Sequence, residues 1–398
     1  MSSPDLSYIL NELGEDHSLH YGAVSPPIYQ TTNFCFRDVA HMREALQHES
    51  SIPFYTRGTN PTIDVVRKKL AALEGAEDAL LFASGSAAVA AAVMVHLRAG
   101  DHVVCVQKPY SWSNKLLNVM LARFGVTTTM IDGTRPEAFA EALQPATKLI
   151  FLESPNSTTY ELQDLAAVAK LARARGIVTV IDNSTASPLG QQPIALGIDL
   201  VVHSATKYIG GHSDAIAGVV CGTHAMMERI FASEFMTLGG VLSPFNAWLL
   251  LRGLRTLPLR YERSCRTAER LVAFLETHPG VERVYYPFSE THPQHELARQ
   301  QMTWAGGQFS VLLRTQAWDA VERFCNTLKR FLLGCSWGGH ESLAFPMCTL
   351  YDSANYQAVL PFNLVRFYAG LEEPEVLIED LRRALAAMDA VPQPAKPH

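Results

Sequence analysis

Several kinds of sequence pattern are missing from this 398-residue chain. No apolar run reaches the roughly 18 residues that a membrane helix needs. No basic cluster stands out, and the formal net charge of −6 argues against a nucleic-acid partner. The seven cysteines are scattered without a C-x-x-C pair, and the 14 histidines show no metal-ligand spacing, which argues against a disulfide framework and a metal site. The polar, acidic start does not read as a signal or transit peptide. These absences leave a cytoplasmic enzyme or binding protein as the expectation.

The composition and the order of the predicted strands and helices are those of a folded two-domain protein. Apolar residues make up 48% and charged residues 18% of a chain too long for one compact core. Residues 1–60 are expected to be a loop-like arm that packs on another subunit. In residues 61–257, strands rich in Val, Ile and Leu alternate with helices, which predicts an α/β domain with a mostly parallel sheet covered on both faces. Residues 258–390 predict a smaller α+β domain, and residues 391–398 a disordered tail.

Three groups of polar residues follow apolar strands, where doubly wound sheets bind ligands. In "FASGSAAV" the chain passes from a strand through Gly85 and Ser86 into a helix, whose first N–H groups favour a phosphate. A serine-capped glycine turn explains the same pattern equally well. In "VTVIDNST" the carboxylate of Asp182 ends a strand and could cap the next segment, or hold a cation or a protonated ring nitrogen.

The third group lies in "DLVVHSATKYIGG". Ser204 and Thr206 offer hydroxyls to a phosphate, and the amine of Lys207 could form an imine with an aldehyde. Burial and a nearby helix terminus should lower the pKa of such a lysine. A phosphate cradle, a carboxylate for a pyridine nitrogen and an imine-forming lysine together meet the requirements of pyridoxal 5′-phosphate (PLP).

The motif "DLVVHSATKYIGGHS" resembles the lysine signature of the Cys/Met-metabolism PLP enzymes. Further segments are similar to that family in the family's order, over nearly the whole chain: "SPPIYQTTNF", "FYTRGTNPT", "FASGSAAV", "FLESPNSTTYEL", "VIDNST", "SWGGHESL" and "RFYAGLE". The resemblance implies a type I (aspartate-aminotransferase-like) fold. It also implies a homo-oligomer, expected to be a tetramer of two dimers that share active sites.

The resemblance assigns a role to each site residue. Lys207 would hold the cofactor and act as the catalytic base, and Asp182 would pair with the pyridine nitrogen. Tyr110 would stack on the ring and belong to the catalytic group. The same subunit would bind the phosphate through Gly85, Ser86, Ser204 and Thr206, and the neighbouring subunit through Tyr55 and Arg57. Substrate would contact Arg366, which clamps the α-carboxylate, together with Ser336, Trp337, Trp112 and Ser157.

The resemblance implies a lyase that eliminates the side-chain leaving group of an amino acid, and it is strongest to cystathionine β-lyases. Trp337 in "SWGG" and Ser157 in "LESPNSTT" differ from the residues expected in γ-lyases. β-Elimination of a cystathionine-like thioether is therefore the first expectation. A γ-lyase for canavanine, methionine or cystathionine is the alternative, followed by a γ-replacement synthase or an inactive homologue.

Two positions depart from the family and affect the substrate. Cys335, just before "SWGG", offers no phenol or charge to a distal ammonium group. Trp112 follows Tyr110 by two residues, where it could place an aromatic face near a cationic leaving group. The alternative for a single tryptophan is packing in the core.

Overall fold

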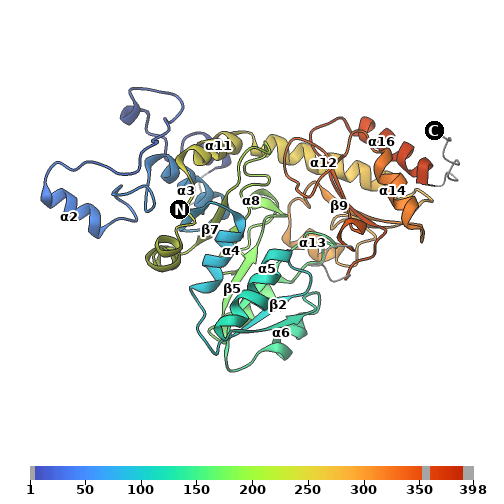
Figure 1. The fold of residues 1–398 in the computed structure, drawn as a ribbon, viewed down its shortest axis with the longest axis horizontal. Helices are drawn as coiled ribbons and strands as arrows, with labels where there is room; N and C mark the ends of the chain where they lie inside the picture. The colour runs from blue at the N-terminus through green and yellow to red at the C-terminus, as the bar shows by residue number, and fades with distance from the viewer. Residues whose placement is uncertain (1–4, 352–358, 389–398) are drawn as a thin grey trace, which may run out of the picture. The chain divides into compact units, whose positions relative to one another are not determined.

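The computed structural model describes residues 5–351 and 359–388, and the predicted tail 391–398 lies outside them. The chain divides into two compact units (Figure 1). Unit 1 comprises Met1–Ser157, Glu161–Pro258 and Glu296–Trp304, and unit 2 comprises Thr158–Tyr160, Leu259–His295 and Ala305–His398. Within the described ranges, no helix is long and apolar enough to cross a membrane.

Unit 1 is built on a seven-stranded sheet in the order β1-β7-β6-β5-β4-β2-β3. Its strands are β1 Asp78–Phe82, β2 His102–Val106, β3 Thr127–Ile131, β4 Thr147–Glu153, β5 Val178–Asp182, β6 Leu200–His203 and β7 Gly218–Gly222. Neighbours are parallel except that β7 runs antiparallel to both β1 and β6. The other six strands therefore point the same way, and their carboxyl ends share one edge. The predicted α/β class with a mostly parallel sheet is confirmed.

Unit 1 also contains α-helices, several of which pack on this sheet. They are α1 Leu6–Asn11, α2 Val39–Gln47, α3 Pro61–Glu74, α4 Gly85–Met94, α5 Ser111–Lys115, α6 Pro136–Ala142, α7 Leu165–Ala174, α8 Ser187–Gly190, α9 His224–Ile230, α10 Met236–Leu238, α11 Pro244–Arg255 and α13 His295–Gln301. Helix α4 packs on β6 and β7, and α3 packs on α11 and β1. Helix α12, Leu257–Glu276, begins at the end of unit 1 and continues into unit 2.

The N-terminal arm differs from the loop that the sequence predicts, because two short helices form in it. Asp5 and Asp38 precede α1 and α2, and their carboxylates accept the N–H groups of Tyr8 at 2.9 Å and His41 at 2.8 Å. Such caps satisfy orphan N–H groups and stabilise a helix start by about 1 kcal/mol. The sequence interpretation gave more weight to the prolines of "SPPIY" than to these aspartates.

A buried ion pair fixes the start of the arm on unit 1. Lys69 of α3 contacts Glu15 at 2.9 Å, with both side chains 0% exposed, and its ammonium also donates to the carbonyls of Ile9 and Leu10. Arg255 reaches the second oxygen of Glu15 at 2.8 Å. The arm is therefore attached through charge as well as apolar packing.

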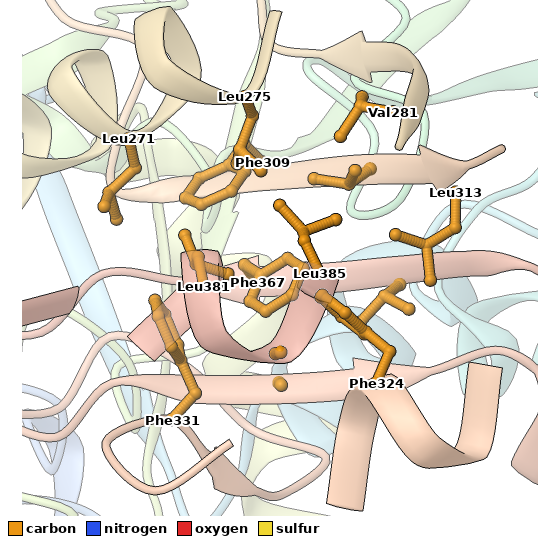
Figure 2. Packing of buried hydrophobic residues seen from close by; sticks show 14 of the residues in the cluster. Leu271, Leu275, Val281, Phe309, Leu313, Phe324, Phe331, Phe367, Leu381 and Leu385 are labelled. Atoms are coloured by element: carbon orange, nitrogen blue, oxygen red, sulfur yellow. The ribbon is translucent and has the colours of Figure 1, made fainter. Parts of the chain in front are cut away.

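Unit 2 contains a five-stranded sheet in the order β10-β11-β12-β9-β8. Its elements are β8 Val281–Tyr285, β9 Gln308–Leu313, α14 Trp318–Thr327, β10 Leu332–Leu333, β11 Leu343–Pro346, α15 Cys348–Tyr351, β12 Leu364–Tyr368 and α16 Pro374–Met388. Figure 2 shows its core, where Phe309, Phe324, Phe331 and Phe367 meet leucines of α12 and α16. Stacking of Phe309 on Phe367, with ring centres 5.5 Å apart, joins the two central strands.

Gly253 generates a prediction, because α11 crosses the segment that follows Lys207 at this residue. A methyl group there would lie 2.4 Å from the carbonyl oxygen of Gly210 and 2.5 Å from that of Ile209. Both obstacles are backbone, so Gly253→Ala should lower the free energy of unfolding by about 1–3 kcal/mol. Thermal and denaturant unfolding measure the change. The control is Gly240→Ala, whose methyl would meet only the side chain of Ala87 at 3.3 Å. Equal stability of the two variants would contradict the prediction.

Candidate active site

Two glycines let the start of α4 approach the ends of β6 and β7. A side chain at Gly85 would place its Cβ 2.8 Å from Cβ of Ser204, and one at Gly218 would lie 2.2 Å from the carbonyl oxygen of Ser84. Ser84 caps the helix by accepting the N–H of Ala87 at 3.1 Å. The exposed Ser86 follows in the first turn. The first N–H groups of α4 and the Ser204 side chain therefore lie close together, and N–H groups at a helix start favour a phosphate.

Thr206 is held differently from Ser204. Its hydroxyl donates to the carbonyl of Ala217 at 3.1 Å and accepts the N–H of that residue at 3.0 Å. These bonds join the segment that carries Lys207 to the approach of β7. Thr206 thus fixes the backbone beside the lysine, and an anion would compete with Ala217 for its hydroxyl proton.

Asp182 ends β5, and its carboxylate is held by Ser184. The N–H and the hydroxyl of Ser184 donate to its Oδ1 at 3.0 and 2.5 Å, and the Ser184 oxygen accepts the N–H of Ser204 at 2.7 Å. Burial raises the pKa of Asp182, while the Ser184 bonds and the charges of His203 and Lys207 act in the opposite direction. A positive ligand group beside this carboxylate would relieve the cost of burying it, so a protonated pyridine nitrogen fits.

Glu153 is a site residue that the sequence interpretation missed. It ends β4 and pairs in register with Asp182. Its carboxylate accepts the N–H of Tyr110 at 2.6 Å and both the N–H and the hydroxyl of Ser157 at 2.9 and 2.8 Å. Burial and the charge of Asp182 raise its pKa to about 7, against the lowering effect of these bonds. The signal was present in "KLIFLE", an apolar strand that ends in a carboxylate as "VTVID" does.

Tyr110 and Trp112 lie at the start of α5, beyond the end of β2. Their side chains are 45% and 57% exposed, so the alternative that Trp112 packs in the core is wrong. The ammonium of Lys115 lies 4.8 Å from the centre of the Trp112 ring, which is a cation–π contact. The carboxylate of Glu153 accepts the N–H of Tyr110, so the backbone at the start of α5, which carries Tyr110 and Trp112, is held in place.

The remaining predicted residues lie elsewhere in the chain. Arg366 is on β12 in unit 2 and donates to the carbonyl of Cys335 at 2.7 Å, which places Ser336 and Trp337 next to its contact. Trp337 is only 7% exposed, so it offers little open ring face. In the arm, the guanidinium of Arg57 lies 5.6 Å from the ring centre of Tyr55, and both side chains are exposed.

Unit 1 thus brings together the first N–H groups of α4, the buried carboxylate of Asp182 and Lys207 at one edge of its sheet. This combination fits a phosphorylated pyridine aldehyde. Within residues 5–351 and 359–388, no group of three His, Cys, Asp or Glu side chains is arranged to hold a metal ion.

Comparisons with known proteins agree with this geometry. Residues 9–386 match the family model described as "Cys/Met metabolism PLP-dependent enzyme". L-Methionine γ-lyase of Pseudomonas putida is 39% identical over 380 residues, covering 94% of this chain and 95% of that protein. Cystathionine γ-lyase of Bacillus subtilis is 37% identical over 370 residues, covering 92% and 94%. The crystal structure of metB from Corynebacterium glutamicum superposes with a TM-score of 0.90 at 36% identity, covering 96% of this chain and 98% of that one. The expected type I fold is confirmed.

Glu153 generates a prediction about pH. Its pKa of about 7 lies above the ordinary value of 4.5, so between these values the folded state keeps a proton that the unfolded state has released. The free energy of unfolding should therefore fall as pH rises from about 4.5 to about 7 and gain no further slope from this group above pH 7. Glu153→Gln should remove this contribution. Unfolding of the holoenzyme between pH 4.5 and 8 measures it, with the exposed Glu282→Gln as control. Parallel curves for wild type and Glu153→Gln would contradict the assignment.

Proposed function

We propose that this chain, which belongs to the Cys/Met-metabolism PLP-dependent enzymes, is a lyase that acts by γ-elimination on a small amino acid. PLP is its cofactor. The observation that carries the choice of γ-elimination is the pair of relatives named as γ-lyases, each similar over more than nine-tenths of both chains. The expected products are ammonia, the released γ-substituent and a 2-oxo acid that keeps the carbon chain from the carboxylate to Cγ.

The proposed roles divide the chemistry among this chain's residues. Bound PLP supplies an electron sink for the negative charge that develops at Cα. Lys207 holds the cofactor and, once its amine is released by substrate, takes the Cα proton. Asp182 keeps a proton on the pyridine nitrogen, and Tyr110 covers the ring. Arg366 binds the α-carboxylate through its planar guanidinium.

The cofactor phosphate is assigned to the cradle at the start of α4. Its proposed ligands are the N–H groups of Gly85 and Ser86 and the hydroxyls of Ser204 and Thr206. The close approach of Gly85 to Ser204 supports this assignment, because a side chain at Gly85 would collide with Ser204 and push the start of α4 away from it.

β-Elimination of a cystathionine-like thioether is the second candidate. It is favoured by Trp337, which stands in "SWGG" where γ-lyases are expected to have another residue. Neither its burial nor the contact of Arg366 with Cys335 distinguishes a β- from a γ-leaving group. The choice between the two eliminations therefore depends on substrate tests.

Trp112 supports a leaving group that is cationic or bulky. Its ring is exposed beside Tyr110 and already carries the ammonium of Lys115 on one face. A guanidine-like group, as in canavanine, would gain roughly 0.5–2 kcal/mol from such a face. Methionine and cystathionine remain the sulfur-containing candidates, and Ser157, fixed by Glu153, is the proposed polar contact near the same helix.

The arm supports a site shared between two copies of the chain. Its exposed large apolar side chains include Leu19, Tyr21, Val24, Val39, Met42 and Leu46. A surface of this kind is typical of a segment that packs on another subunit. We therefore assign Tyr55 and Arg57 to the phosphate of the neighbouring site, in a tetramer built from two such dimers.

All seven cysteines are free thiols, which supports the cytoplasm as the compartment.

A substrate panel tests the reaction. Methionine, cystathionine, canavanine, homocysteine and cystine are each supplied as sole substrate, and pyruvate, 2-oxobutyrate, homoserine and ammonia are measured. We expect 2-oxobutyrate and ammonia from a γ-substituted substrate, and Lys207→Ala as control should give less than about one-thousandth of the rate. Homoserine without ammonia would indicate replacement of the leaving group by water. Pyruvate from cystathionine, with the γ-substrates inert, would establish the β-lyase instead. Product formed only when a thiol is added would indicate replacement.

Mixing experiments test the shared site. Arg57→Ala and Lys207→Ala chains should each be nearly inactive alone, because each lesion affects every site. After dissociation and random reassembly, half of the dimers are mixed and carry one intact site, so about a quarter of wild-type activity should return. Lys207→Ala mixed with Asp182→Asn is the control, since both lesions lie on the same chain's side of the site. No recovery in verified mixed oligomers would refute sharing through Arg57.

A further inference from the structure

A glutamate and a histidine are buried together behind the strand ends of the site. Glu74 is the last residue of α3, and His203 is the last residue of β6. Nε2 of His203 is hydrogen-bonded to Oε1 of Glu74, and each side chain is only 1% exposed. Alternation along β6 puts Val202 in the core beneath α4 and His203 on the opposite face of the sheet.

Hydrogen bonds connect this pair to the neighbours of Asp182. Asn183 follows Asp182 directly, and its amide donates to Oε1 of Glu74 at 3.4 Å and to the carbonyl of Gln191 at 2.9 Å. On the other side, His203 precedes Ser204, whose N–H reaches Asp182 through the hydroxyl of Ser184. One carboxylate oxygen of Glu74 therefore contacts both Asn183, which follows Asp182 after β5, and His203 at the end of the neighbouring strand β6.

Packing alone does not account for such a pair. A buried pair of ionisable groups seldom makes the folded protein more stable than apolar side chains of similar volume would. Oε2 of Glu74 is buried and makes no hydrogen bond within the part of the chain that the structure describes. A group kept at this cost, directly behind a cofactor-binding carboxylate, calls for a role at the site.

The charges around Asp182 indicate that role. Glu153 stands beside it on β4 and adds negative charge, while His203 on β6 and Lys207 beyond it add positive charge. Burial raises the pKa of Asp182, and the charge of His203 lowers it. Without His203, the buried carboxylates of Asp182 and Glu153 would face less positive charge, and Asp182 would hold a proton more readily.

We propose that Glu74 and His203 are positioning residues for the cofactor: the buried pair ties the end of β6 to Asn183 next to Asp182, and so keeps the carboxylate of Asp182 placed to hold the proton on the pyridine nitrogen. This inference rests on the proposed contact between Asp182 and that nitrogen. Neither residue touches substrate or cofactor in this scheme, so both act through Asp182.

The test measures the pyridine proton directly. Holoenzymes are prepared with ¹⁵N-labelled PLP, and the ¹⁵N resonance is followed for wild type, Asp182→Asn, Glu74→Gln and His203→Gln. Asp182→Asn should move the resonance from the protonated to the neutral position. Glu74→Gln and His203→Gln should move it in the same direction at neutral pH, with kcat about tenfold lower, because the carboxylate of Asp182 is no longer held in place.

Glu15→Gln is the matched control, because Glu15 is an equally buried carboxylate paired with a cation on the same helix α3. It should leave the ¹⁵N resonance unchanged. An unmoved resonance in Asp182→Asn would refute the pyridine contact, and with it the proposed role of Asp182. If Asp182→Asn shifts but neither Glu74→Gln nor His203→Gln does, or if Glu15→Gln shifts equally, the positioning role is overturned. Should Glu74→Gln yield no holoenzyme, His203→Gln decides.

Discussion

The close approach of α4 to the ends of β6 and β7 is the contact on which the site depends. Gly85 and Gly218 allow it, because a side chain at either position would collide with Ser204 or with the backbone of Ser84. The approach brings the first N–H groups of α4 to the same edge as Asp182 and Lys207. A doubly wound sheet offers a crevice at this edge in any case, and these two glycines let the start of α4 lie against Ser204 there.

Charge is distributed around that contact in a definite pattern. Two carboxylates, Glu153 and Asp182, end adjacent strands, and burial raises the pKa of both. Each carboxylate also accepts hydrogen bonds: Glu153 from Tyr110 and Ser157, and Asp182 from Ser184. The site therefore combines high electrostatic cost with tight hydrogen bonding, which is typical of pre-organised catalytic centres.

The sequence predicted most of the sheet because most of its strands are continuous apolar runs buried on both faces. The exception is β3, whose three threonines are not buried, so that no apolar run marks it. The sequence predicted the residues at the ends of β1, β5 and β6 because polar groups there are conspicuous. It missed Glu153, whose partners Tyr110 and Ser157 become neighbours only through the order of β2 and β4. It also missed the helices of the arm, where the caps at Asp5 and Asp38 are local signals outweighed by nearby prolines. The burial of Trp337 and the exposure of Trp112 depend on tertiary packing, which no local pattern encodes.

β7, the strand that runs antiparallel to its two neighbours, also determines when the sheet of unit 1 can be completed during synthesis. β1 emerges early, yet its sheet partner is β7, and Asp78 pairs with Gly222. Until β7 has left the ribosome, β1 and α4 have no sheet to join, and loop closure over so long a segment is slow. The cradle at Gly85 is therefore a late product of folding, assembled after Asp182 and Lys207 are already in the chain. A nascent polypeptide that ends before β7 therefore lacks the strand on which β1 pairs, which makes the pairing of β1 with β7 a marker of completed folding of the unit 1 sheet.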